Sequence, residues 1–129
     1  MIVLDTHAWL FWVDENFKAL SKKAGAALEH ADVLGVSAIS CWEIAMLVSK
    51  QRLAFRIDVE DWITQALKYP KVQLLNLEPN ISVLSTRLPG KFHGDPADRI
   101  IVATCMKYDA PLVTKDRNIR RWKRIETIW

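Results

Sequence analysis

Four acidic residues lie in short motifs whose composition suits metal-assisted chemistry. They are Asp5 in IVLDTHAW, Glu43 in SCWEIA, Asp98 in DPADRI and Asp116 in VTKDRN. Carboxylates without ligand-spaced His or Cys partners favour a hard cation, Mg²⁺ or Mn²⁺. Without a cation, four neighbouring acids would repel one another and some would retain protons. With one, they can orient a water molecule for in-line attack on phosphorus and stabilise the leaving oxygen.

The apolar patterning predicts the elements that must bring these acids together. We expect strands at residues 1–4, 33–38, 72–77 and 112–114, with a final edge strand at 125–129. Helices are expected at residues 6–13, 21–30, 40–51, 59–69, 79–88 and 96–108, and the Gly- and Pro-rich segment 89–96 is expected to be a loop. Strands that alternate with helices predict an α/β sandwich around a parallel sheet. Without repeats or a linker, residues 1–129 are interpreted as a single domain.

The predicted strands place two acids at one edge of this sheet. Asp5 ends the first strand, and Asp116 closely follows a late one. In open parallel sheets, ligands bind beyond the carboxyl ends of the strands. Glu43 and Asp98 open helices that we expect to pack beside those strand ends. The four carboxylates are therefore predicted to converge on one small volume.

Each acid also has a purely structural interpretation. Ser40 and Glu43 have the spacing of a capping box, in which the Glu reaches back to the N-cap amide. Asp95 fits an N-cap followed by proline, with Asp98 in the favourable first turn. The acid after the first strand could cap the next helix, and the acid after the late strand could hold an Asx turn. Capping does not compete with metal binding, because an acid at a helix start can do both.

Composition and charge favour a protein that binds a polyanion over a membrane or exported protein. The sequence has 18 basic and 15 acidic residues, and neutralising four acids with metal would leave 18 against 11, a surface that suits a polyanion. No apolar run approaches the roughly 20 residues of a membrane span, and the apolar N-terminus has no basic leader typical of an export signal. Cys41 and Cys105 are interpreted as free buried thiols, which favours the cytoplasm.

Other catalytic motifs are missing from the sequence. It contains no GxSxG, Walker A or HExxH pattern, which agrees with a hydrolysis that needs no protein nucleophile. A phosphoacceptor signalling domain also gathers acids at strand ends beside a Thr-Lys pair, here Thr114 and Lys115. That alternative needs a second acid beside Asp5 and an Asp after a middle strand. Segment 72–77 instead runs into Glu78, so we rank it low.

Four segments together resemble PIN-domain nucleases, and more narrowly the VapC-type toxins of toxin–antitoxin pairs. They are IVLDTHAWLFW, SAISCWEIAML, HGDPADRIIVATC and LVTKDRNI, in the family's order along the whole chain. The resemblance implies a three-layer α/β/α sandwich with a central, mostly parallel sheet. It also implies Mg²⁺- or Mn²⁺-dependent endonucleolytic cleavage of RNA, a homodimer, and silencing by a cognate antitoxin. Housekeeping RNA processing or DNA cleavage on the same fold remains an alternative.

The resemblance also assigns roles to individual residues. Asp5, Glu43, Asp98 and Asp116 match the family's metal-binding, catalytic acids. Accessory positions are Asp95, a less central acid; Thr6 and Thr114, whose hydroxyls could orient water or a carboxylate; and Arg99 and Arg117, which could contact phosphate or neutralise the cluster.

Several histidines, cations and aromatic residues have two interpretations. We favour local hydrogen bonding over metal ligation for His7 and His93. A basic group near the C-terminus could line an RNA path beside Asp116 or form a solvated face. Its members are Lys115, Arg117, Arg120, Arg121, Lys123 and Arg124. The first helix carries Trp9, Phe11 and Trp12, some of which we expect to face a partner, whereas Trp42 and Trp62 are expected in the core.

Overall fold

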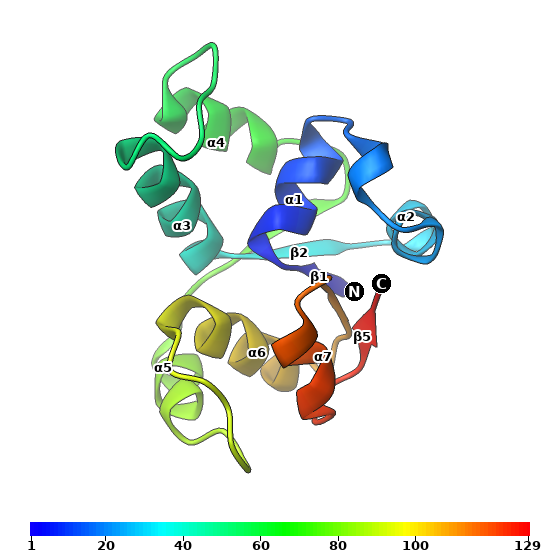
Figure 1. Cartoon of the computed structure of the whole chain (residues 1–129), viewed down its shortest axis with the longest axis vertical. Coiled ribbons are helices and arrows are strands. Elements are labelled where there is room, and N and C mark those ends of the chain that lie inside the picture. Colours follow the sequence, from blue (N-terminus) through cyan, green and yellow to red (C-terminus); the bar gives the residue numbers. More distant parts are fainter.

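The computed structural model describes residues 1–129, which form a five-stranded parallel sheet between two layers of helices (Figure 1). The strands are β1 (Ile2–Leu4), β2 (Leu34–Ser37), β3 (Val72–Leu75), β4 (Leu112–Val113) and β5 (Thr127–Ile128). Their spatial order is β3-β2-β1-β4-β5, and every neighbouring pair is parallel. The predicted α/β class with a central parallel sheet is therefore confirmed.

Seven α-helices and one short 3₁₀ helix surround this sheet. They are α1 (Thr6–Val13), η1 (Phe17–Ala19), α2 (Lys22–His30), α3 (Ala38–Ser49), α4 (Val59–Leu67), α5 (Pro79–Thr86), α6 (Pro96–Tyr108) and α7 (Arg117–Trp122). Helices α1 to α4 cover one face, and α5 to α7 cover the other (Figure 1). None of the helices has the length and apolar character needed to cross a membrane.

Alternate residues of each central strand enter opposite cores, which explains the three layers. Leu4 and Val113 pack into the core under α1 to α4, whereas Val3 and Leu112 pack into the core under α5 and α6. All four side chains are fully buried. A strand that is apolar on both faces needs helices on both faces, so these short apolar runs require the three-layer architecture.

The start of α3 and the presence of α7 are the main differences from the sequence-based expectation, and helices α3, α4 and α5 each end two residues earlier than predicted. Helix α3 begins at Ala38, because the Ser37 hydroxyl accepts a hydrogen bond from the Ile39 amide and acts as the N-cap. The predicted capping box that starts at Ser40 is therefore wrong, and Ser40 lies inside the first turn. Helix α7 was not predicted, since its six residues are mostly charged and bury only Ile119. Asp116 caps this helix and does not hold an isolated Asx turn.

The tryptophans divide between core and surface. Trp9 is fully buried and meets Trp62 edge to face, with ring centroids 5.4 Å apart. Trp62 is in the core as predicted, but Trp42 is 57% exposed, so its predicted burial is wrong. Phe11 and Trp12 are half-buried against the core, and their contact with a partner remains a prediction. Cys41 and Cys105 are both free, as predicted, but only Cys105 is buried; Cys41 is half-buried.

The close approach of β3 to β2 generates a stability prediction. A Cβ on Gly35 would lie 2.7 Å from Cδ1 of Leu75, a buried side chain with little room to move. We expect Gly35→Ala to destabilise the protein by about 1–3 kcal/mol through overpacking. Thermal or urea unfolding measures the loss.

Gly25 in α2 is the matched control. A Cβ there meets no atom within 4 Å. Because alanine favours a helix, Gly25→Ala should stabilise the protein by up to about 1 kcal/mol. Equal effects of the two substitutions would contradict the packing argument.

Candidate active site

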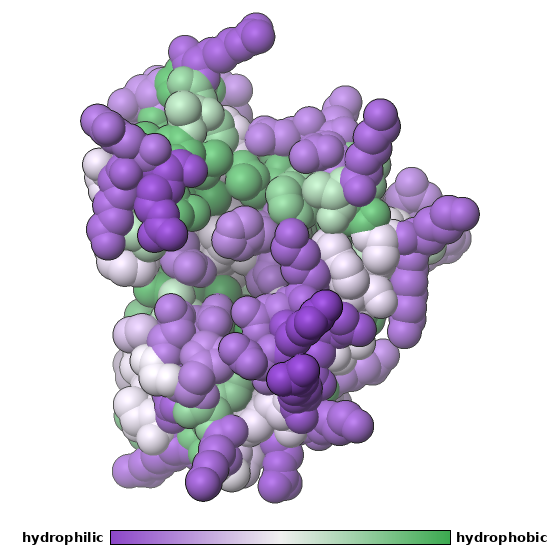
Figure 2. All heavy atoms as spheres, viewed as in Figure 1, coloured by the Kyte–Doolittle hydropathy of each residue, from purple (hydrophilic) through white to green (hydrophobic).

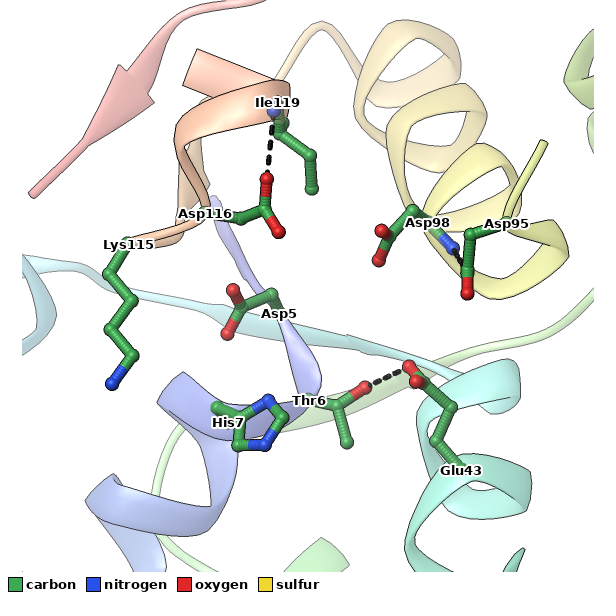
Figure 3. A pocket seen from close by; sticks show the side chains of 9 residues that line it. All are labelled: Asp5, Thr6, His7, Glu43, Asp95, Asp98, Lys115, Asp116 and Ile119. Carbon is green, nitrogen blue, oxygen red and sulfur yellow. Dashed lines mark hydrogen bonds between the residues drawn. The ribbon is translucent and has the colours of Figure 1, made fainter. Parts of the chain in front are cut away.

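A cavity of about 490 Å³ opens at the carboxyl edge of the sheet, and all four predicted catalytic acids line it (Figure 3). Its lining residues are Asp5, Thr6, His7, Glu43, Asp95, Asp98, Lys115, Asp116 and Ile119. The acids come from β1, α3, α6 and the start of α7, and their side chains surround one open space (Figure 3). The structure thus brings together residues separated by up to 111 positions in the sequence.

Asp5 and Asp116 are held by the helices that they cap. β1 and β4 are parallel neighbours, so the residues that follow them emerge side by side. The Ala8 amide donates to Asp5 Oδ1 at 2.7 Å, and the Ile119 amide donates to Asp116 Oδ1 at 3.0 Å. Each cap engages one carboxylate oxygen of its acid. The second oxygen of each acid has no backbone partner.

The first turn of α6 supplies the acids of the DPAD motif. The Asp98 amide donates to Asp95 Oδ1 at 2.9 Å, which makes Asp95 the N-cap, with Pro96 in the first turn as predicted. His93 Nε2 lies 3.3 Å from Asp98 Oδ2 and forms an ion pair when protonated, although the geometry does not satisfy a hydrogen bond. His93 Nδ1 accepts from the Asp95 amide at 3.3 Å, consistent with the predicted local role.

Two buried hydroxyl groups fix the position of Glu43. Thr6 Oγ1 donates to Glu43 Oε1 and lies 3.0 Å from the hydroxyl of Ser40. Since Thr6 has only one hydroxyl proton, and the carboxylate takes it, Ser40 supplies the proton between the two hydroxyls. Ser40 is fully buried and was missed as a site residue, because the sequence pattern alone suggested a cap.

Burial raises the pKa of three of the acids. For Asp5, burial outweighs the hydrogen bonds from Thr114 and Ala8, so its pKa rises. Burial likewise raises the pKa of Glu43 against the opposing hydrogen bond from Thr6. Burial, with the added repulsion of Asp95 and Glu43, raises the pKa of Asp98 to about 7. Gathering these acids is therefore unfavourable without a compensating positive charge.

The donor set fits a hard divalent cation. Five carboxylates line the cavity, and neither cysteine does. As the side chains lie, no group of three His, Cys, Asp or Glu residues is close enough together to hold one ion. Mg²⁺ retains several water molecules and binds through one or two carboxylates, so three direct protein ligands are not required.

The other predicted accessory residues lie at different distances from the cavity. Thr114 is fully buried beneath it and accepts a hydrogen bond from the Asp116 amide at 3.1 Å. Arg99 donates instead to the backbone carbonyls of Ser85, Phe92 and His93, at 2.8 to 3.0 Å, and so holds the 89–95 loop. Arg117 lines a separate surface pocket. The structure therefore brings neither guanidinium into the cavity.

Lys115 is a cavity residue that the sequence analysis placed in the basic group near the C-terminus but not among the site residues. It lines the cavity with His7, and its Nζ lies 5.5 Å from the centroid of the Phe11 ring. Its place directly before Asp116 was the available signal. Lys115 is the only Lys or Arg among the lining residues.

An acid-lined cavity at the edge of a parallel α/β/α sandwich defines a known class of nuclease fold. The sequence matches the PIN domain family over residues 2–125, and the chain belongs to that family.

Relatives within this class include Ribonuclease VapC22 of Mycobacterium tuberculosis, which is 39% identical over 130 residues, spanning 99% of this chain and 98% of the relative. Solved structures with the same fold include VapBC2 from Rickettsia felis bound to a promoter DNA fragment, with a TM-score of 0.71 and 17% identity over 98% of this chain and 97% of the other. FitAcB from Neisseria gonorrhoeae has a TM-score of 0.67 and 17% identity over 98% and 96% of the two chains. The PIN-like three-layer prediction is confirmed.

The raised pKa of Asp98 generates a pH prediction for the metal-free protein. Between the ordinary pKa of 3.8 and about 7, the folded state binds more protons than the unfolded chain, so stability falls as pH rises through this window. Asp98→Asn removes this ionisation and should be the more stable protein above pH 7. We expect a gain of about 1–2 kcal/mol, because partial exposure screens the full effect. Urea unfolding against pH in EDTA measures it.

The exposed loop acid Asp32 provides the control. Asp32→Asn should give no difference that grows between acidic and neutral pH. A gain from Asp98→Asn that stayed constant with pH would contradict the assignment of the raised pKa to this carboxyl.

Proposed function

We propose that this protein is a VapC-type, metal-dependent endoribonuclease that hydrolyses RNA phosphodiester bonds at the cavity of Asp5, Glu43, Asp98 and Asp116. The observation that carries the proposal is the convergence of these four acids in one cavity. Full-length similarity to a ribonuclease of the VapC class supports it. Asp95, which caps α6, is an accessory acid in this proposal, as the resemblance to the family implies.

The acids hold Mg²⁺ or Mn²⁺ in this proposal. When bound, the cation would act as a Lewis acid that activates water, and it would neutralise negative charge on the phosphate oxygens. Asp5 and Asp116 present oxygens from rigid cap positions, and Thr6 orients Glu43. Lys115 offers a positive charge to a phosphate oxygen at the cavity mouth. No protein nucleophile is needed for this hydrolysis.

Toxin activity with an antitoxin partner is the biological setting that we infer. The solved neighbours include a toxin–antitoxin complex from Klebsiella pneumoniae, with a TM-score of 0.63 and 19% identity over 92% and 90% of the two chains. A homodimer remains a prediction. Exposed apolar side chains that a second copy could cover are Trp42, Leu74, Leu77 and Val83. The cytoplasm is the proposed location.

Housekeeping RNA processing or DNA cleavage is the alternative for the same cavity. The phosphoacceptor alternative has less support, because β3 leads to Glu78, outside the cavity, and Asp5 is the only acid directly after β1. The substrate and the cellular effect separate the remaining possibilities.

Loss of a cavity acid should abolish cleavage. We expect Asp5→Asn to slow cleavage of single-stranded RNA by about 10²-fold or more, as for loss of one preorganised charged group. EDTA should stop the wild type, and added Mg²⁺ or Mn²⁺ should restore it. Gel analysis of structured and unstructured RNA, with a DNA strand of the same sequence, measures both effects.

Asp32→Asn, an exposed acid outside the cavity, is the control and should cleave at the wild-type rate. Undiminished cleavage by Asp5→Asn, or by the wild type in EDTA, would refute the mechanism. Preferential cleavage of DNA would favour the alternative.

Expression of the wild type should arrest bacterial growth if the protein is a toxin. Asp5→Asn, which alters a metal-binding acid but not the apolar core, should relieve the arrest at equal protein level. Colony counts after induction measure this effect. Arrest by both proteins alike would show that toxicity does not depend on RNA cleavage.

A further inference from the structure

Four cations gather on one concave surface next to the active site. Arg117, Arg120, Arg121 and Lys123 line a pocket of about 310 Å³, together with Thr127 of β5. We call these four cations the α7 patch. Figure 2 shows strongly hydrophilic side chains over α7 on the face that contains the cavity mouth. No acidic residue lines this pocket.

The structure divides the basic group that the sequence suggested as an RNA path. Lys115 belongs to the acidic cavity. Arg124 lines a different pocket together with Asp109 and Glu126, and Lys123 borders both that pocket and the α7 patch. The α7 patch retains the other four cations. These four cations line one pocket that contains no acidic residue, so they are not scattered over a solvated face.

The α7 patch has no internal compensation. All four side chains are exposed, and none forms an ion pair or a side-chain hydrogen bond; the molecule's ion pairs are His93–Asp98 and Lys107–Glu78. Arg117 lies three residues before Arg120 and four before Arg121, so like charges share one helix face and repel one another. This repulsion between cations destabilises the protein when nothing is bound. A bound anion would relieve it, which favours an anion-binding role for the surface.

Helix stabilisation explains only part of the α7 patch. Arg120 and Arg121, in the last turn, complement the negative end of the helix dipole. Arg117 is the first residue of α7, at the positive end, where a cation is unfavourable.

The position of the α7 patch identifies the anion. Asp116 caps α7 and lines the acidic cavity, so the patch begins one residue after a proposed catalytic acid. An RNA whose reacting phosphate lies in the cavity meets five carboxylates there. Its neighbouring phosphates, on the α7 side, meet the four cations instead. A continuous polyanion can occupy both surfaces at once.

We propose that the α7 patch is a phosphate-binding subsite that holds the single-stranded RNA backbone on one side of the bond to be cut; this deepens, and rests on, the proposed ribonuclease function. Contacts to phosphates position a nucleic acid without reading its sequence. The patch therefore contributes affinity and register, and it offsets the repulsion between RNA and the acidic cavity.

The test measures RNA binding separately from cleavage. All proteins carry Asp5→Asn, and binding of fluorescein-labelled mixed-sequence RNA and oligo(U) is measured by anisotropy in EDTA over a range of salt concentrations. We compare Arg120→Gln/Arg121→Gln with the matched control Lys22→Gln/Lys23→Gln. The control removes the same charge from exposed positions at the start of α2.

Loss of the two arginines should weaken binding of both RNAs several-fold and alike. The slope of log affinity against log salt should become shallower by about 1.4, since each single-strand phosphate contact contributes about 0.7. The control pair should leave this slope nearly unchanged. With wild-type Asp5 and metal present, the arginine pair should raise KM for RNA more than it lowers kcat.

Equal changes from the two double variants would overturn the proposal, because net charge alone would explain them. An unchanged salt slope, or a loss of binding to poly-glutamate without loss of RNA binding, would also overturn it; the latter would assign the patch to an acidic protein. If the wild type bound RNA through the patch but did not cleave it with metal, the ribonuclease proposal would fail and the phosphate-binding surface would stand.

Discussion

Repulsion among carboxylates at one edge of the sheet is the constraint on which this structure depends. The parallel pairing of β1 with β4 brings Asp5 beside Asp116, and α3 and α6 add Glu43, Asp95 and Asp98. Burial makes this arrangement more costly, as the raised pKa of Asp98 shows. A fold that keeps such a cluster needs a rigid framework, and a divalent cation would neutralise the repulsion between the acids.

The framework is rigid because three of these acids also begin helices. Asp5, Asp95 and Asp116 each accept a backbone amide as the N-cap of the helix that follows. The positive end of each helix dipole then offsets part of the negative charge. In the proposed function, the same side chains serve both as helix caps and as metal ligands. Glu43 is held differently, through Thr6 and the buried Ser40.

The acidic cavity and the basic α7 patch are built in part from one short stretch of chain. Residues 115–123 contribute Lys115 and Asp116 to the acidic cavity and all four cations of the α7 patch. In the proposed function, the metal-bound cavity and the basic surface beside it form a path for the RNA backbone. The same helix thus connects the proposed chemistry with the proposed binding of RNA.

The sequence by itself determined the strand–helix alternation, the parallel sheet and the four acids. These follow from local signals: short apolar runs, proline at the start of α6, and acids at strand and helix ends. It did not determine the start of α3, helix α7, the exposure of Trp42 or the role of Ser40. The role of Ser40 depends on a contact between distant segments, because its partner Thr6 lies 34 positions away. The starts of α3 and α7 depend on local caps at Ser37 and Asp116, which the apolar pattern does not reveal. Whether an acid is only a cap or also a member of a cluster was decided by the tertiary structure, because only strand order places β1 beside β4.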